Sequence, residues 1–285
     1  MKASILTSTL LELLNPASAA VKSNALYTEA VLSADTSLGI RVLDNSFSFA
    51  DTRPAVVHQP GAFLLDWPGE AGETLLAVRD FVATLDPDAR CDLSVEADGN
   101  KLKLRLQQGK VTARFIVRRE TAEPVQQPAQ DVFRVRVNDL LRGVRLTIPA
   151  AAKDGVRPVL NAICFSLSDG KLELKASNGY WGALHAASAD VAVAEAREYV
   201  ADQDALERLM RVTAKMKPAD DEVISARIAH GGLEFAIGNA VMTVQLVALK
   251  YPDLRSLFRQ VDPAAPRIWL DEAERALKTL KPFRT

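Results

Sequence analysis

The sequence repeats its own apolar pattern at a long interval. Residues 75–115 match residues 206–246 without a gap, so that Leu75 falls on Leu206 and Phe115 falls on Leu246, 131 positions later. The matched stretch contains a helical spacing of apolar residues, a proline break and three alternating strand patterns. Solenoid repeats recur every ~20–50 residues, so a period this long indicates a duplicated domain. Duplication favours a symmetric assembly over a single asymmetric catalytic cleft.

The flanking segments repeat in the same order with small changes in the interval. Asp44 falls on Asn178, 134 positions later, because the second copy carries an insertion that includes residues 154–158. A third copy begins near Ile268, and a linker with two prolines and no apolar periodicity separates the first two copies. We therefore predict a first domain at 1–120, a linker at 121–130, a second domain at 131–260 and the start of an incomplete third domain at 267–285.

The spacing of apolar residues predicts the elements of each copy. Recurrence every three or four residues predicts helices at 8–20, 74–85, 138–147 and 205–217, and Pro16 can kink the first of them. Alternating apolar residues bounded by glycine turns predict antiparallel hairpins with one buried face. Within each copy, one helix followed by three strands occurs twice. The predicted fold class is α+β, with duplicated helix-plus-antiparallel-meander units.

The composition of the chain indicates the cellular compartment in which it resides. No stretch approaches the ~20 apolar residues of a membrane-spanning helix. Polar residues interrupt the N-terminal apolar segment, so we expect no secretory signal. Cys91 and Cys164 lie in apolar strand patterns, which predicts buried free thiols in a reducing cytoplasm.

Motifs that support catalysis are scarce. The three histidines, His58, His185 and His230, lie far apart and have no cysteine or carboxylate at metal-ligand spacing. No glycine-rich phosphate loop follows a strand, and no G-x-S-x-G elbow is present. The acidic run at 220–222 is typical of a solvated loop. We expect no enzymatic activity, no cofactor and no metal.

Three motifs occur in order in and after the second copy: KDGVRPVLNA at 153–162, ASNGYWGA at 176–183 and YPDLRSLF at 251–258. In this order they resemble the bacterial beta sliding clamp, the processivity subunit of the replicative polymerase, DNA polymerase III. The corresponding family segments are V-R-x-x-L-N-G, A-T-D-G-H-R-L-A and Y/F-P-D-Y-R. The resemblance covers both complete copies and the start of the third. It implies a DNA clamp fold, with helices on the inner face of a ring around duplex DNA and sheets that continue across domain junctions. It also implies the replicative polymerase and its clamp loader as partners, and no membrane.

Basic residues collect on the outer faces of two predicted helices and in the loop between them. A directional positive field of this kind binds phosphates without reading sequence. The simpler interpretation is that these are ordinary solvated helix faces; the resemblance favours DNA binding. The predicted DNA-binding residues are Arg142, Arg145, Lys153, Arg157, Arg208, Arg211, Lys215 and Lys217.

The resemblance also implies a pocket for partner peptides. Glycine and aromatic residues can take up apolar side chains of a partner. The alternative is that Gly179 is a turn residue and that Tyr180 and Trp181 belong to the core. The family's His, Arg and Leu are replaced here by Tyr180, Trp181 and Gly182, which alters the pocket. The predicted pocket residues are Ser177, Gly179, Tyr180, Trp181, Gly182, Pro252 and Leu257.

The resemblance predicts a DNA sliding clamp subunit that tethers the polymerase. The alternative is a diverged clamp-like module that binds replication proteins without encircling DNA. Two complete domains could close only as a trimer, with the edge at 111–117 pairing with the edge at 242–246 of a neighbour. The tail at 261–285 would sit near that junction. We therefore expect a monomer or a weak, non-closing oligomer.

Overall fold

The computed structural model describes residues 1–22, 28–66, 73–120, 129–153, 157–168, 170–193, 195–229 and 231–254. The chain divides into a compact unit, Met1–Pro252, and a second unit, Asp253–Thr285. The helices and strands of the described residues all belong to the Met1–Pro252 unit. The predicted third-domain elements and Leu257 lie outside the described residues. In the described part of the chain, no helix is long and apolar enough to cross a membrane.

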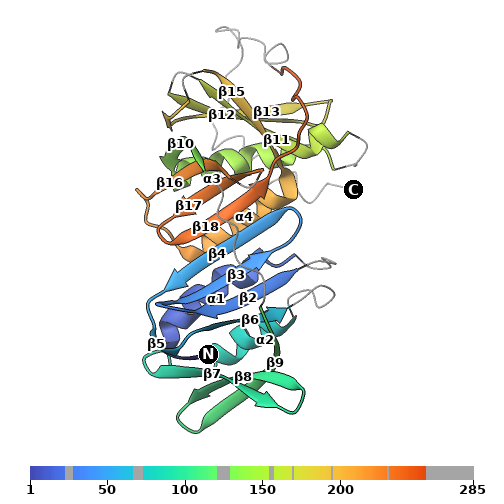
Figure 1. Ribbon diagram of the computed structural model, residues 1–285. Coiled ribbons are helices and arrows are strands. Elements are labelled where there is room, and N and C mark those ends of the chain that lie inside the picture. Colours follow the sequence, from blue (N-terminus) through green and yellow to red (C-terminus); the bar gives the residue numbers. More distant parts are fainter. Residues whose placement is uncertain are drawn as a thin grey trace, which may run out of the picture. The chain divides into compact units, whose positions relative to one another are not determined.

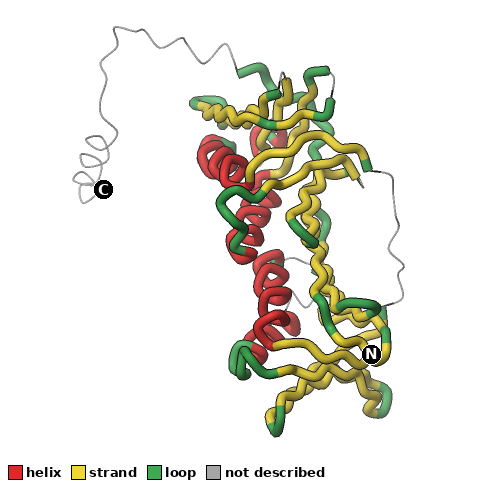
Figure 2. Tube along the Cα trace, turned by 90° about the vertical axis from the view of Figure 1, so that its left-hand side faces the viewer, coloured by secondary structure: helices red, strands yellow, loops and turns green. Residues whose placement is uncertain are grey.

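Four α-helices confirm the four predicted from apolar spacing. Each buries apolar side chains at intervals of three or four residues, such as Leu75, Val78 and Val82 in the second helix. The first helix runs through Pro16 without interruption. The helices gather on one side of the Met1–Pro252 unit and the strands on the other (Figure 2). The bounds are α1 (Thr7–Ala20), α2 (Glu73–Val82), α3 (Val137–Thr147) and α4 (Gln203–Met216).

The order strand, helix, three strands occurs four times along the unit (Figure 1). The first two occurrences are formed by β1 (Lys2–Leu6), β2 (Glu29–Ala34), β3 (Leu38–Leu43) and β4 (Phe47–Arg53) with α1, and by β6 (Gly61–Asp66), β7 (Arg90–Asp98), β8 (Lys101–Gln108) and β9 (Val111–Arg119) with α2. The other two are formed by β10 (Gln130–Arg136), β11 (Ala162–Ser168), β12 (Lys171–Ser177) and β13 (Gly182–Ser188) with α3, and by β15 (Arg197–Asp202), β16 (Val223–Ala229), β17 (Gly232–Ile237) and β18 (Ala240–Gln245) with α4. Short additional elements are β5 (Val56–Gln59), β14 (Asp190–Val191) and two 3-10 turns, Ile148–Ala150 and Pro158–Asn161.

The two repeats share one sheet. Strand β18 of the second repeat pairs antiparallel with β4 of the first, with Val241 opposite Ala50 and Val244 opposite Phe47. This pairing joins 14 strands into one sheet and confirms the predicted continuation of a sheet from one repeat into the next. It also means that the edge at 242–246 is occupied within the chain. The pairing of that edge with a neighbouring subunit, which a trimer of this chain would require, is therefore not available.

The strand pairing corrects the repeat interval at one point. Leu104 pairs with Phe115, and its equivalent Phe235, 131 positions later, pairs with Met242. Phe115 is thus equivalent to Met242, an interval of 127, and the predicted match of Phe115 with Leu246 is wrong. The hairpin of β8 and β9 is longer in the first repeat, and a shift of four residues preserves the alternation of buried and exposed positions. The apolar pattern could not reveal the shift.

The core lies between the helices and the sheets, and both cysteines belong to it. Cys91 and Cys164 are free and buried, as predicted. Burial raises the pKa of the Cys91 thiol to about 11 and that of Cys164 to about 12. Both thiols stay protonated near neutral pH, which makes them poor nucleophiles.

Candidate nucleic-acid interface and partner loop

Five predicted DNA-binding residues lie exposed on or directly after the helices of the second repeat. In α3, Leu140 and Val144 face the core, which turns Arg142 and Arg145 outward. In α4, Leu209 and Val212 are buried, and the remaining cations of this group point away from them. Within the described ranges, none of the five forms an ion pair. The group is Arg142, Arg145, Arg211, Lys215 and Lys217, which we call the helix-face cations.

Arg208 is not one of them, and its prediction as a DNA-binding residue is wrong. The residue is 1% exposed. Its guanidinium forms an ion pair with Asp44 in the turn between β3 and β4 and lies 4.9 Å from the centre of the Phe47 ring. It also donates to Ser46 Oγ and to the carbonyl oxygen of Ala20 at 3.5 Å. Because α4 packs against α1 and the β3–β4 turn, the face of α4 at Arg208 is covered by the first repeat.

The Asp44 carboxylate is held ionised by this arrangement. Burial opposes ionisation, but the hydrogen bonds and charge of Arg208, with the backbone N–H groups of Ser46 and Phe47, outweigh it and lower the pKa of Asp44 below its ordinary value. Asp44 Oδ1 accepts from these two backbone groups at 2.8 and 3.0 Å. A buried pair with this many hydrogen bonds fixes one geometry at the junction of the two repeats.

The last two predicted DNA-binding residues lie apart from the helix-face cations. Lys153 is exposed and lines a cavity of about 320 Å³ together with Asp202, Asp204 and Glu207. The negative charges of these carboxylates offset the positive charge of Lys153 and weaken its attraction for a DNA phosphate. Arg157 is exposed and donates from Nη2 to the carbonyl oxygen of Asn178 at 2.8 Å. The structure thus places Arg157 at the predicted partner pocket.

The predicted pocket segment 177–182 is a tight turn between β12 and β13. Asn178 Oδ1 accepts from the backbone N–H groups of Tyr180 at 2.9 Å and Trp181 at 3.1 Å. Ser177 Oγ accepts from the Gly179 N–H at 3.0 Å and donates to the Trp181 carbonyl oxygen at 2.9 Å. Gly179 has φ +90°, and a Cβ there would clash with Arg157 Nη1. Gly179 is therefore the turn residue that the alternative interpretation predicted.

The aromatic residues of this turn are exposed. Tyr180 is 92% exposed and Trp181 is 51% exposed, so the alternative that they belong to the core is wrong. The turn is fixed by hydrogen bonds, and its rings face solvent. Aromatic side chains have few rotatable bonds, so they lose little conformational freedom when they bind a partner. We call residues 177–182 the partner loop.

Tyr251 connects the partner loop to the segment that follows β18. The backbone N–H of Ser177 donates to Tyr251 Oη at 3.0 Å, and Tyr251 is buried. Burial raises the pKa of Tyr251 to about 12. Pro252 is exposed directly after it. The structure thus brings together two segments that the sequence placed in one pocket, although Leu257 lies outside the described residues.

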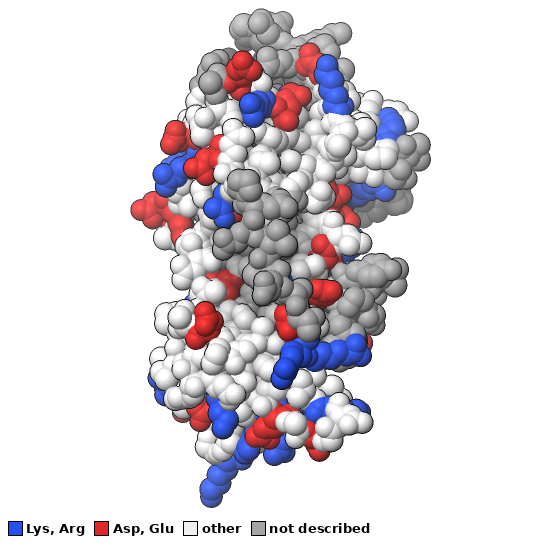
Figure 3. Space-filling view, in the orientation of Figure 1, with Lys and Arg blue, Asp and Glu red and all other residues white. Residues whose placement is uncertain are grey.

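On the opposite face of the unit, the described charged residues are of both signs. Figure 3 views the side that carries the strands, where Lys and Arg are interspersed with Asp and Glu. Several strand cations are paired locally, such as Arg105 with Glu96 and Lys103 with Asp98. A mixed surface has little long-range field. The five helix-face cations, by contrast, lie on or directly after two neighbouring helices, exposed and without an ion pair among the described residues.

Asp44 and Tyr251 are the residues at these sites that sequence reasoning missed. The signal for Asp44 was its match with Asn178 in the repeat, since both open the same turn. The signal for Tyr251 was its place in a motif directly after the last strand.

Solved structures that resemble this fold include bacterial sliding clamps. The beta sliding clamp of C. crescentus superposes with a TM-score of 0.77 at 20% identity, over 91% of this chain and 68% of the clamp. The clamp from Bacillus subtilis gives a TM-score of 0.77 at 19% identity over the same shares. The DNA polymerase III beta subunit from Thermotoga maritima gives 0.73 at 20%, again over 91% and 68%. The sequence matches no protein-family model and no curated protein. The α+β class and the DNA clamp fold are thereby confirmed, and identities this low establish the fold alone.

Proposed function

We propose that this chain is a subunit of a sliding clamp that encircles duplex DNA and tethers a replicative polymerase in the cytoplasm. The observation that carries the proposal is the group of five helix-face cations, exposed and without ion-pair partners, on the helix side of a DNA clamp fold. The domains of the subunit would be 1–120 and 131–260. The subunit would act by forming part of a closed ring around DNA, and it would catalyse no reaction.

The cations act on DNA through charge alone. Arg and Lys side chains on a helix face reach phosphate oxygens and release condensed counterions, which gives affinity without base recognition. Few contacts keep the binding weak, so the protein can slide. The ion pair of Arg208 with Asp44 would support this surface by fixing α4 beside α1.

The salt dependence of DNA binding tests the electrostatic part. Replacing Arg211 and Lys215 together with Ala should reduce the slope of log affinity against log salt by about one to two units. The matched control is Lys171→Ala with Arg197→Ala, two exposed cations on strands β12 and β15. The control should keep the wild-type slope. An unchanged slope in the helix variant, or a strong preference for one DNA sequence, would contradict the proposal.

Retention on circular DNA tests encirclement. A topological clamp stays on a nicked circle in high salt and leaves when the circle is cut, because its ends then become free. Simple electrostatic binding is lost in high salt from both forms. Equal loss from circular and linear DNA would refute encirclement while leaving the weak DNA contact intact.

The partner loop carries the tethering part of the proposal. Tyr180 and Trp181 offer two exposed aromatic anchors for a peptide of a polymerase or clamp loader. The same exposure favours a second candidate function, a clamp-like module that binds replication proteins without encircling DNA. Partner binding through the loop together with no retention on circles would establish that second function.

A further inference from the structure

The helices of the two repeats carry opposite net charge. In the first repeat, the segment of α1 at 7–20 contains one acid and no Lys or Arg, and the segment of α2 with its following turn at 73–86 contains three acids and one Arg. The equivalent segments of the second repeat, 137–150 and 204–217, together contain three acids and six Lys or Arg. The net charge of these segments therefore changes from −3 in the first repeat to +3 in the second.

Burial fixes which positions of the helices are equivalent. The buried positions of α1 recur in α3 at an interval of 130, and those of α2 recur in α4 at an interval of 131. The helices of the two repeats therefore turn equivalent faces toward solvent. The buried pairs include Leu10 with Leu140, Leu14 with Val144, Leu75 with Leu206 and Val78 with Leu209.

Every helix-face cation of the second repeat corresponds to an acid or an uncharged polar residue in the first. Both members of each pair are exposed, so the repeats differ at these positions in charge rather than in burial. Carboxylates stand at three of the five places where the second repeat has Lys or Arg. The pairs are Arg142 with Glu12, Arg145 with Asn15, Arg211 with Asp80, Lys215 with Thr84 and Lys217 with Asp86.

The sign of the charge changes where α1 packs against α4. Lys22, directly after α1, forms an ion pair with Asp204 at the start of α4 at 3.0 Å, so these two charges offset each other. Further along α4, Arg211 and Lys215 line a cavity of about 460 Å³ together with Ser18 of α1. The cationic surface of the second repeat therefore reaches the edge of the first repeat and ends there.

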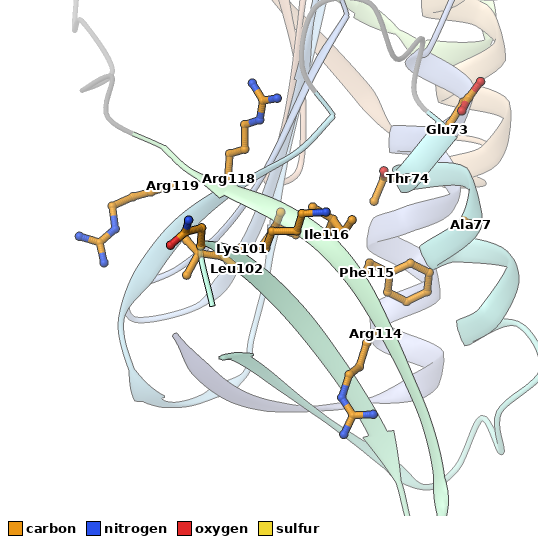
Figure 4. Close-up of a pocket in the computed structure, with 12 residues that line it drawn as sticks. Glu73, Thr74, Ala77, Lys101, Leu102, Arg114, Phe115, Ile116, Arg118 and Arg119 are labelled. Atoms are coloured by element: carbon orange, nitrogen blue, oxygen red, sulfur yellow. The ribbon is translucent and has the colours of Figure 1, made fainter. Parts of the chain in front are cut away.

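Cations of the first repeat beside α2 belong to its strands. Figure 4 shows a cavity of about 970 Å³ to which α2 contributes Glu73, whereas β8 and β9 contribute Lys101 and Arg114. Phe115 faces α2, because its ring lies 6.2 Å from the ring of Phe81. Neighbouring side chains of a strand point to opposite faces of the sheet, so Arg114 points away from the helix. These cations do not make the helix surface of the first repeat positive.

We propose that duplex DNA lies against α3 and α4 of the second repeat and stays away from α1 and α2 of the first. This inference rests on the proposed function, because it takes duplex DNA as the ligand. The helix-face cations attract phosphates, and Glu12, Asp80 and Asp86 repel them at the equivalent places. Exposed charges are largely screened beyond about 8 Å in physiological salt, so a phosphate responds to the repeat that it touches. DNA therefore follows an off-centre path along the helix side of the chain.

Directed cleavage of DNA tests this path at two matched positions. Ala83 and Ala214 are both exposed, and the interval of 131 makes them equivalent. A chain with Ala83→Cys or Ala214→Cys carries an iron chelate on the new thiol, since the native Cys91 and Cys164 are buried. Linear duplex DNA in low salt serves as the target, so the result does not depend on encirclement. The chelate at position 214 should cleave the DNA, and the chelate at position 83 should cleave no more than free chelate does.

Transfer of the cations tests charge as the cause. Asp80→Arg, Thr84→Lys and Asp86→Lys give the first repeat the residues of the second at exposed positions, so the fold should persist. The chelate at position 83 should then cleave DNA. The slope of log affinity against log salt should steepen by about two to three units, because three phosphate contacts become available.

The outcomes separate the path from the DNA contact itself. Equal cleavage from positions 83 and 214 in the chain without the added cations would overturn the off-centre path and leave DNA binding intact. Absence of cleavage from both positions would contradict the path and the proposed DNA contact together. If the variant with the added cations gave no cleavage from position 83, charge would be excluded as the cause.

Discussion

Replacing Arg208 should destabilise the fold more than replacing an exposed charged residue. Its ion pair with Asp44 is buried, so water cannot take the place of a lost partner. The side chains of Arg208 and Asp44 are 2% and 9% exposed. Removing one member of a buried pair leaves an uncompensated charge, which destabilises a protein by about 3–5 kcal/mol. Arg208→Ala and Asp44→Asn should each lower the free energy of unfolding by about this amount. That is a large share of the ~5–15 kcal/mol that holds a typical domain together.

The double variant distinguishes pairing from simple loss of packing. Asn and Ala are the residues that the chain itself carries at the equivalent positions 178 and 77. In the Asp44→Asn, Arg208→Ala protein no charge is left unpaired. The double variant should therefore be more stable than the sum of the single effects predicts, by about 2–3 kcal/mol. Urea unfolding followed by far-ultraviolet circular dichroism gives all four free energies, provided that the m-values agree.

The pH dependence gives an independent measurement. The pKa of Asp44 is lowered in the folded state, so its contribution is complete above the ordinary carboxyl pKa and is lost as the pH falls through the lower folded value. The stability difference between wild type and Asp44→Asn should be constant near pH 7 and should shrink below about pH 4. Additive single effects, or a difference that does not change down to about pH 2, would refute the reasoning.

Two further predictions concern the partner loop and its support. Tyr251→Phe removes the acceptor of the Ser177 N–H and should destabilise the loop by about 1–2 kcal/mol, seen as faster exchange of the Ser177 amide. Because burial raises the pKa of Tyr251 to about 12, its contribution in wild type should be complete below about pH 10 and should be lost as the pH rises through about 12; a loss near neutral pH would contradict this. A Gln-x-x-Leu-Phe peptide of the family's type should bind poorly, and any residual binding should depend on Pro252 and Leu257. Tight calorimetric binding that survives Leu257→Ala would show that the pocket has been placed wrongly.

The repeat and its helices could be predicted from sequence because their signals are local and strong. The apolar stripe of α2, for example, contains Leu75, Val78 and Val82, and all three are buried as the spacing predicted. The duplicated order of helix and strands followed from the same signals. Strands β5 and β6 were not predicted. Their segment contains Pro54 and Pro60, which interrupt the alternation that identifies a strand.

The shift of β9 and the burial of Arg208 could not be predicted because they depend on pairing between distant segments. A hairpin lengthened by four residues keeps the same apolar alternation, so the gapless match stayed plausible until the strand partners were known. Arg208 stands on the polar side of α4 when that helix is considered alone. The first repeat supplies Asp44, Ser46 and the Ala20 carbonyl oxygen, and these groups make its burial favourable.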